Sequence, residues 1–193
     1  MKNIIILTNI QTTGLSFETD SLIELSMIAI DTDNNCETIY KPFHHKITWN
    51  INRIKREIDL VASRITGYTK EDIDTFENSI EVVKDLSQWI KELKRETGVD
   101  KFWFCSFNEF TYTFFRNFLY NTTGANIFNQ IFYYRDLRLQ DLSIVKIIQN
   151  FDILNNPNFK FSRDIIFSIL CPNVDTKKIV GKDYNILKAI FSK

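Results

Sequence analysis

The chain has 193 residues with 24 basic and 24 acidic side chains, so its formal net charge is zero. This length suits one ordinary domain with its own core, and we expect residues 1–193 to form a single domain. With 44% apolar residues, 3 prolines and 5 glycines, the composition argues against long linkers or a disordered tail. Zero net charge is also not typical of a protein that binds phosphate backbones strongly.

The N-terminal residues argue against membrane targeting. The run Ile4 to Leu7 holds four apolar side chains, which is shorter than a signal-peptide core and far shorter than the roughly 18 residues of a membrane span. We therefore expect a cytoplasmic protein that does not associate with membranes. Cys36, Cys105 and Cys171 are widely spaced without neighbouring histidines, so they are predicted to be buried free thiols.

The first 43 residues predict a meander of three strands. Ile4–Ile10 is an apolar run, and Ser21–Asp31 is a second one after a Thr-Thr-Gly turn. Cys36–Phe43 is a third strand that we expect Pro42 to end, because proline cannot donate to a ladder. His44 and the adjacent His45 are then expected in a surface loop.

The middle of the chain predicts helices. Over 49–63 helical and irregular patterns compete, and Thr69 is placed to cap a short helix. A longer helix is predicted over Ser79–Glu96 from apolar residues three and four apart, with Asn78 and Glu81 as a capping box. Gly98 is expected to end it.

The last part alternates strands and helices. We expect strands at 101–107 and 130–134, and helices at 111–121, from 137 to 148, at 161–170 and at 184–191. The aromatic side chains of these segments could stack on nucleic-acid bases, but their spacing favours core packing. The order of elements predicts an α/β sandwich, in which helices cover a mixed sheet.

The N-terminal strand and turn also carry a motif. Residues 9–15 read NIQTTGL, and the strand at 21–31 reads SLIELSMIAID. This pair resembles the first motif of the DEDD superfamily of 3'-5' exonucleases, which are DnaQ-like enzymes with an RNase H-like fold. Their usual form is Asp-x-Glu-Thr-Thr-Gly-Leu before an Ile-Ile-Glu-Ile strand, so Asn9 and Gln11 stand where the family has two carboxylates.

Later segments resemble the same family in the same order. They are RITGYTKED at 64–72, FCSFNEFTYTFF at 104–115, FYYRDLRLQDL at 132–142 and KKIVGKDYNILKAI at 177–190. The resemblance covers nearly the whole chain and implies a mixed five-stranded sheet flanked by helices. It also implies nucleic-acid contacts from Thr12, Thr13, Gly14, Leu15, Asn108 and Phe110.

Enzymes of this family need negative charge at the site. Four carboxylates hold two divalent cations about 4 Å apart, one activating the attacking water and the other stabilising the leaving oxygen. In this chain the aspartate position of the second motif aligns with Thr111, and Asp183 is the candidate acid of the last motif. Lys178 lies near the place of the general-base histidine. A register shift by one residue would put Lys182 at the acid position and leave no acid.

A site that should hold four carboxylates therefore keeps at most one, Asp183. We expect no metal cofactor, or weakly bound Mg²⁺ or Mn²⁺, because these hard ions require charged oxygen ligands. Loss of a general base alone costs about 10²- to 10⁴-fold in rate. The sequence predicts an exonuclease-fold protein that has lost 3'-5' exonuclease activity and binds single-stranded DNA or RNA, or a protein partner.

Several alternatives stay open at this point. Asn9 and Gln11 could be an engineered inactivating pair, although Thr111 and the missing histidine favour natural degeneration. Glu109, Asp31 or Asp183 could instead rebuild a metal site and leave an active or weak exonuclease. Asp183 is equally well explained as the N-cap of the last helix. A purely regulatory or structural module that binds a partner is the third alternative, and the oligomeric state stays open.

Overall fold

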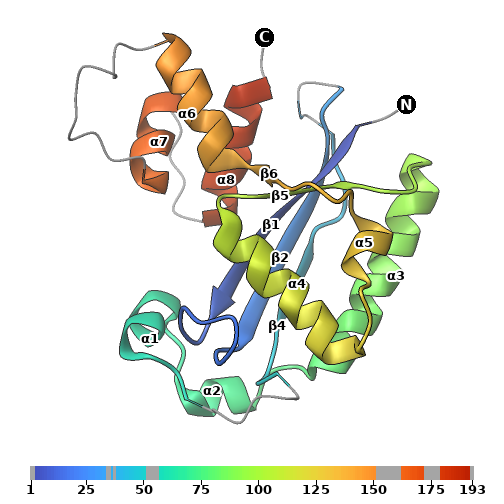
Figure 1. The fold of residues 1–193 in the computed structure, drawn as a ribbon, viewed down its shortest axis with the longest axis vertical. Helices are drawn as coiled ribbons and strands as arrows, with labels where there is room; N and C mark the ends of the chain where they lie inside the picture. Colours follow the sequence, from blue (N-terminus) through green and yellow to red (C-terminus); the bar gives the residue numbers. More distant parts are fainter. Residues whose placement is uncertain are drawn as a thin grey trace.

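The computed structural model describes residues 3–33, 36, 38–50, 57–150, 162–171 and 179–191. Lys178, the predicted place of the general base, lies outside the described residues. Within the described part, a mixed sheet lies at the centre with helices on both faces (Figure 1). This confirms the α/β, RNase H-like architecture.

The central strand is β1 (Ile4–Thr12), which pairs antiparallel with β2 (Leu22–Asp31) and parallel with β5 (Trp103–Ser106). A parallel strand β6 (Leu137–Arg138) extends the sheet beyond β5. Nearly every residue of β1 is buried, because helices cover both faces of a central strand. These strands confirm the mixed sheet.

The third predicted strand is divided into two. β3 (Thr38–Ile39) and β4 (Phe43–Lys46) both pair with β2, so the sheet has five positions across and six strands among the described residues. Pro42 lacks an N–H and interrupts the ladder, but pairing resumes at the next residue. The third strand therefore ends before Pro42, at Ile39, and a separate strand begins directly after Pro42. The prediction of a surface loop for both histidines was wrong, because they lie on β4.

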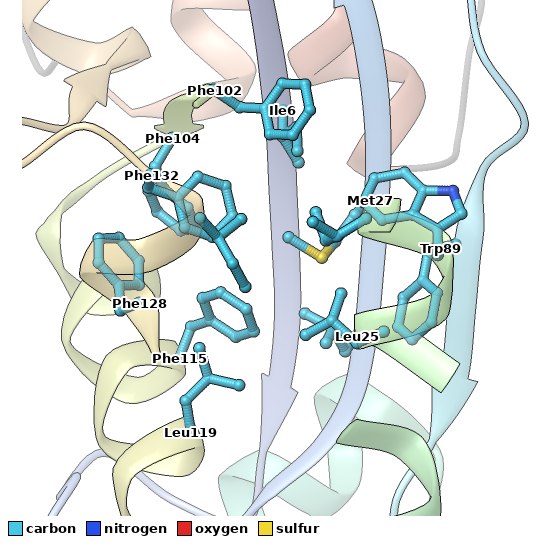
Figure 2. Close-up of a cluster of buried hydrophobic side chains, with 14 of the residues drawn as sticks. Ile6, Leu25, Met27, Trp89, Phe102, Phe104, Phe115, Leu119, Phe128 and Phe132 are labelled. Carbon is cyan, nitrogen blue, oxygen red and sulfur yellow. The ribbon is translucent and has the colours of Figure 1, made fainter. Parts of the chain in front are cut away.

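One face of the sheet is covered by α3 (Ser79–Thr97), α4 (Glu109–Thr123) and the short α5 (Phe128–Ile131). Figure 2 shows phenylalanines from α4, α5 and β5 meeting the apolar side chains of β1 and β2 in this layer. Phe104 and Phe115 stack with ring centroids 5.6 Å apart. Core packing of the aromatic residues is confirmed for Phe102, Phe104 and Phe132, whereas Tyr133 and Tyr134 are exposed.

The other face is covered by α6 (Leu139–Asn150), α7 (Arg163–Leu170) and α8 (Ile179–Phe191). Figure 1 shows these three helices gathered beside β1. Cys36 and Cys105 are buried in this layer, and Cys171 is buried at the end of α7. All three are free thiols as predicted, and burial raises the pKa of each.

Two short helices, α1 (Leu60–Thr66) and α2 (Lys70–Asp74), lie near the carboxyl end of β1 (Figure 1). Thr69 caps α2 as predicted, in a reciprocal capping box with Asp72. α1 buries none of its residues. Among the described helices, none has the length and apolar character needed to cross a lipid bilayer.

Other local predictions need correction. The strand predicted at 130–134 is reduced to a single parallel bridge between Phe132 and Phe102. Residues Phe128–Ile131 form the short helix α5 instead, and the strand β6 follows at 137–138. Asn78 caps α3 through the Ile80 N–H, but Glu81 pairs with Lys84 instead of completing a capping box.

Candidate active site with a buried ion pair

Asn9 and Gln11 project from the same face of β1, because side chains two residues apart on a strand share a face. This is the face of Leu7, which packs with Ile186 and Leu187 of α8. Asn9 is buried, with 7% of its surface exposed, and Gln11 is half-buried near the end of the strand. A change of register between Gln11 and Thr12 then leads the chain into the turn.

Asp183 lies in α8 and is fully buried. Its Oδ1 is 2.9 Å from Nε of Arg163, the first residue of α7, and the Asn9 side chain lies close enough to influence its pKa. Lys182 instead reaches Asp164 at 2.7 Å. Asp183, and not Lys182, is therefore the residue of this segment that lies beside Asn9 and Arg163. The N-cap explanation of Asp183 was wrong, because α8 already begins at Ile179.

The Asp183 carboxyl is held in an environment of low polarity. Burial raises its pKa from 3.8 to about 6, against the opposing effects of Arg163, Asn9 and Lys182. Neither Asp183 oxygen has a partner with full hydrogen-bond geometry among the described residues, so the contact with Arg163 is an ion pair without an aligned hydrogen bond. The Arg163 guanidinium also lies 4.4 Å from the centre of the Phe107 ring.

A second carboxylate, Glu24, lies on β2 directly opposite Gln11. Its Oε2 accepts a hydrogen bond of 2.6 Å from the Tyr68 hydroxyl, and Oε1 is 3.9 Å from Nδ1 of His44. Burial and this carboxylate raise the pKa of Tyr68. The Glu24 carboxylate is thus held by contacts with Tyr68 and with His44 of β4.

The two remaining candidate acids, Glu109 and Asp31, do not lie at Asn9, and the neutral residue Thr111 occupies the aspartate position of the second motif. Thr111 is buried in the first turn of α4 with 4% of its surface exposed. Glu109 is largely exposed, and its Oε2 lies 3.3 Å from Arg138. Asp31 pairs with Ile4 at the far end of the sheet, about 17 Å along β1 from Asn9 at 3.3 Å per residue.

An open hollow of about 700 Å³ adjoins the end of β1. Its lining includes Gln11, Thr12, Gly14, Leu15 and Phe110, together with residues 58–62, 65 and 66 from α1 and the segment before it. Leu15 is 83% exposed. Four of the six residues predicted to contact nucleic acid therefore line one hollow beside Gln11.

The other two predicted contacts have structural surroundings of their own. The Thr13 hydroxyl accepts from the Ser21 N–H at 2.9 Å and lies 3.5 Å from Asp20 within the turn. Asn108 is the N-cap residue of α4 without a side-chain cap bond, and its carbonyl accepts from the Ser106 hydroxyl. Neither residue lines the hollow described above.

The donor set at this site does not fit a two-metal centre. Asn9 and Gln11 are neutral, Glu24 is hydrogen-bonded to Tyr68, and Asp183, the buried acid beside Asn9, is already paired with a guanidinium. Hard divalent cations prefer several charged oxygen ligands. A different group of candidate ligands among the described residues, His45, Glu77 and Asp85, lies near α3. Asn9 pairs with Ser26 of β2, and Ser26 pairs with His44 of β4, so these three side chains lie on one face of the sheet. His45 is the next residue along β4 and therefore points to the opposite face.

Arg163 was not among the predicted site residues. One signal was available, since a cation in the first turn of a helix opposes the helix dipole. An apolar helix that begins with arginine therefore needs a tertiary partner for that charge. The sequence did not identify the partner, because Asp183 lies 20 residues further on.

The family model for exonucleases, RNase_T, matches residues 11–153, and the chain belongs to this exonuclease family. No curated protein matches the chain by sequence.

Three solved structures with a similar fold are nucleases. E. coli exonuclease I in complex with a 5cy-dA13 oligonucleotide superposes with a TM-score of 0.71 at 14% identity, over 97% of this chain and 40% of that chain. Cell-death related nuclease 4 (CRN-4) superposes with a TM-score of 0.67 at 14% identity, over 98% of this chain and 62% of that chain. The nuclease domain of 3'hExo, a DEDDh family member bound to rAMP, superposes with a TM-score of 0.63 at 18% identity, over 98% of this chain and 90% of that chain.

These identities are low, so the likeness shows the fold. The chain spans about two fifths of the exonuclease I chain and about three fifths of the nuclease 4 chain.

Proposed function

We propose that this protein is a non-hydrolysing member of the exonuclease family that binds the 3' end of single-stranded nucleic acid. Residues 1–193 would form one exonuclease-like domain. The observation that carries the proposal is the chemistry around Asp183. The amides of Asn9 and Gln11 are neutral, Thr111 is a hydroxyl, and Arg163 pairs with the remaining acid.

Loss of charge removes hydrolysis for a physical reason. Two divalent cations bring four positive charges, which a single carboxylate already paired with arginine does not neutralise. Asn9 and Gln11 keep the shape of Asp and Glu, so the surrounding backbone needs no rearrangement. The natural gene would carry these residues, since Thr111 and Arg163 differ from the expected pattern as well.

The hollow beside Gln11 supports ligand binding. Leu15 and Phe110 offer apolar contact to a base, and Thr12 and Gly14 lie at the same wall. Aromatic and apolar platforms hold unpaired bases with little sequence preference. Exonuclease I and 3'hExo have been solved with an oligonucleotide and with rAMP, and the same fold here supports the same class of ligand.

The binding half of this proposal is tested by fluorescence anisotropy of 3'- and 5'-labelled single-stranded DNA and RNA at low salt with EDTA. We expect binding that does not need a divalent cation and that weakens when the 3' end is blocked by a bulky label. Absence of binding by every oligonucleotide would overturn it.

A second candidate function is docking of a protein partner. The observation that favours it is the apolar surface of α1, where Leu60, Val61 and Ile65 are 77%, 66% and 69% exposed. Isolated exposed apolar residues are common, but three on one short helix beside Leu15 form a patch typical of interaction sites. This candidate is preferred if oligonucleotides fail to bind.

A further inference from the structure

The strongest unexplained feature of the site is a permanent positive charge at its centre. Arg163 places Nε 2.9 Å from the fully buried Asp183 carboxylate, and only 25% of its side chain is exposed. We infer that the Arg163 guanidinium takes the place of a divalent cation beside Asp183, and that this internal cation keeps the site free of metal. The inference rests on the proposed loss of the metal centre and not on nucleic-acid binding.

The guanidinium neutralises Asp183 as a metal ion would, without dissociating. Arginine stays protonated at all accessible pH values, so its charge is fixed in place by the chain. The side chain of Asn9, at the first carboxylate position of the family motif, lies close enough to Asp183 to lower its pKa. A divalent cation entering between Asn9 and Asp183 would meet a like charge in a water-poor setting, where repulsion is strong.

Local packing holds Arg163 at this position. Its guanidinium lies over the Phe107 ring at 4.4 Å, and its backbone begins α7. The Ser162 hydroxyl caps that helix by accepting from the Ile165 N–H. A metal ion would therefore have to displace a side chain that a ring and a capped helix both position.

The ion pair also joins three elements of the site. Arg163 lies on α7, Asp183 on α8, and Asn9 on β1. Metal ions commonly join ligands from separate elements in the same way. Restoring the lost carboxylates alone should therefore not restore metal binding, because the place of the cation is taken.

The test is isothermal titration of MnCl₂ into four proteins. They are the unmodified chain, Asn9→Asp/Gln11→Glu/Thr111→Asp, the same triple variant with Arg163→Gln, and the triple variant with Arg95→Gln as a matched control. Arg95 is exposed in the last turn of α3, where its charge is remote from the ion pair. We expect Mn²⁺ binding at least tenfold tighter in the Arg163→Gln combination than in the triple variant or the control.

Two results would overturn the inference. One is equal Mn²⁺ binding by the triple variant with and without Arg163→Gln, and the other is absence of binding by both. If extra carboxylates prevent folding, judged by circular dichroism, the pair Asn9→Asp and Asn9→Asp/Arg163→Gln gives the same comparison with one added acid. Tight Mn²⁺ binding by the unmodified chain that is lost in Asp183→Asn would instead contradict the proposed loss of the metal centre itself.

Discussion

Arg163 and Asp183 form an ion pair across two helices, with Nε and Oδ1 2.9 Å apart and the carboxylate fully buried. The pair stands beside Asn9, in a site where the exonuclease family is expected to use metal ions. The Asp183 carboxylate is fully buried in α8, which packs with β1 and α7 in one hydrophobic layer. The first consequence concerns stability.

Arg163→Gln should lower the free energy of unfolding by about 3–5 kcal/mol, because it leaves a buried carboxylate without its cation. Urea unfolding at pH 7 measures this. Adding Asp183→Asn to Arg163→Gln should recover part of the loss, since no uncompensated charge remains. Lys84→Gln, which breaks the exposed pair with Glu81, should change stability by less than about 1 kcal/mol. Equal effects of the Lys84 and Arg163 variants would contradict the role of the ion pair.

Stability should also depend on the titration of Asp183. Its pKa is raised from 3.8 to about 6 in the folded state, so the folded protein holds this proton more tightly than the unfolded chain. The stabilising contribution is therefore fully present below about pH 4 and is lost as pH rises through about 6, by about 3 kcal/mol in total. Urea unfolding between pH 3.5 and 7.5 should show this decline superimposed on other titrations, and Asp183→Asn should remove it. Identical pH profiles of the two proteins would contradict the raised pKa.

A substitution in the wall of the hollow beside Gln11 should change oligonucleotide affinity without changing the stability of the fold. Leu15 is 83% exposed, so Leu15→Ala should leave the midpoint of thermal unfolding nearly unchanged. It should weaken binding of single-stranded oligonucleotides several-fold, because it removes apolar contact from the wall of the hollow. Tyr134→Ala, which alters an exposed aromatic residue outside this hollow, is the control. Unchanged affinity in Leu15→Ala would show that the hollow does not hold the ligand.

Gly14 should be intolerant of a side chain. A Cβ at this position would lie 2.4 Å from Oδ2 of Asp20 and 2.6 Å from Oδ2 of Asp59. Asp20 is buried and accepts the Ser16 N–H at 2.9 Å, so it has little freedom to move. Gly14→Ala should therefore cost about 1–3 kcal/mol of stability and weaken oligonucleotide binding as well. Wild-type melting and binding in this variant would show that the turn can rearrange freely.

Secondary structure could be predicted from the sequence where the apolar pattern or a capping residue alone determines the element. The apolar runs of β1 and β2, the capping of α2 by Thr69 and the end of α3 at Gly98 were all predicted from local chemistry. Gly98 adopts a positive φ of 72° there, which suits a residue without a side chain. The predicted strand at 130–134 was only partly right, because Phe132 bridges to Phe102 while the residues just before it form α5.

The candidate site was predictable only in part. Motif order identified Asn9, Gln11 and Asp183, and the structure brings Asn9 and Asp183 together. The order of motifs in the sequence could not identify Arg163, because its ion pair with Asp183 depends on how α7 and α8 pack. Lys178 stays a prediction, since it lies outside the described residues.

The central claim, that hydrolysis has been lost, is tested most directly by incubating 3'-labelled single-stranded DNA and RNA with the unmodified protein in Mg²⁺ or Mn²⁺. We expect full-length oligonucleotide on denaturing gels after long incubation, with the same result for Asp183→Asn. Progressive shortening from the 3' end that disappears in Asp183→Asn would contradict the claim, because it would show that Asp183 still serves a working metal site.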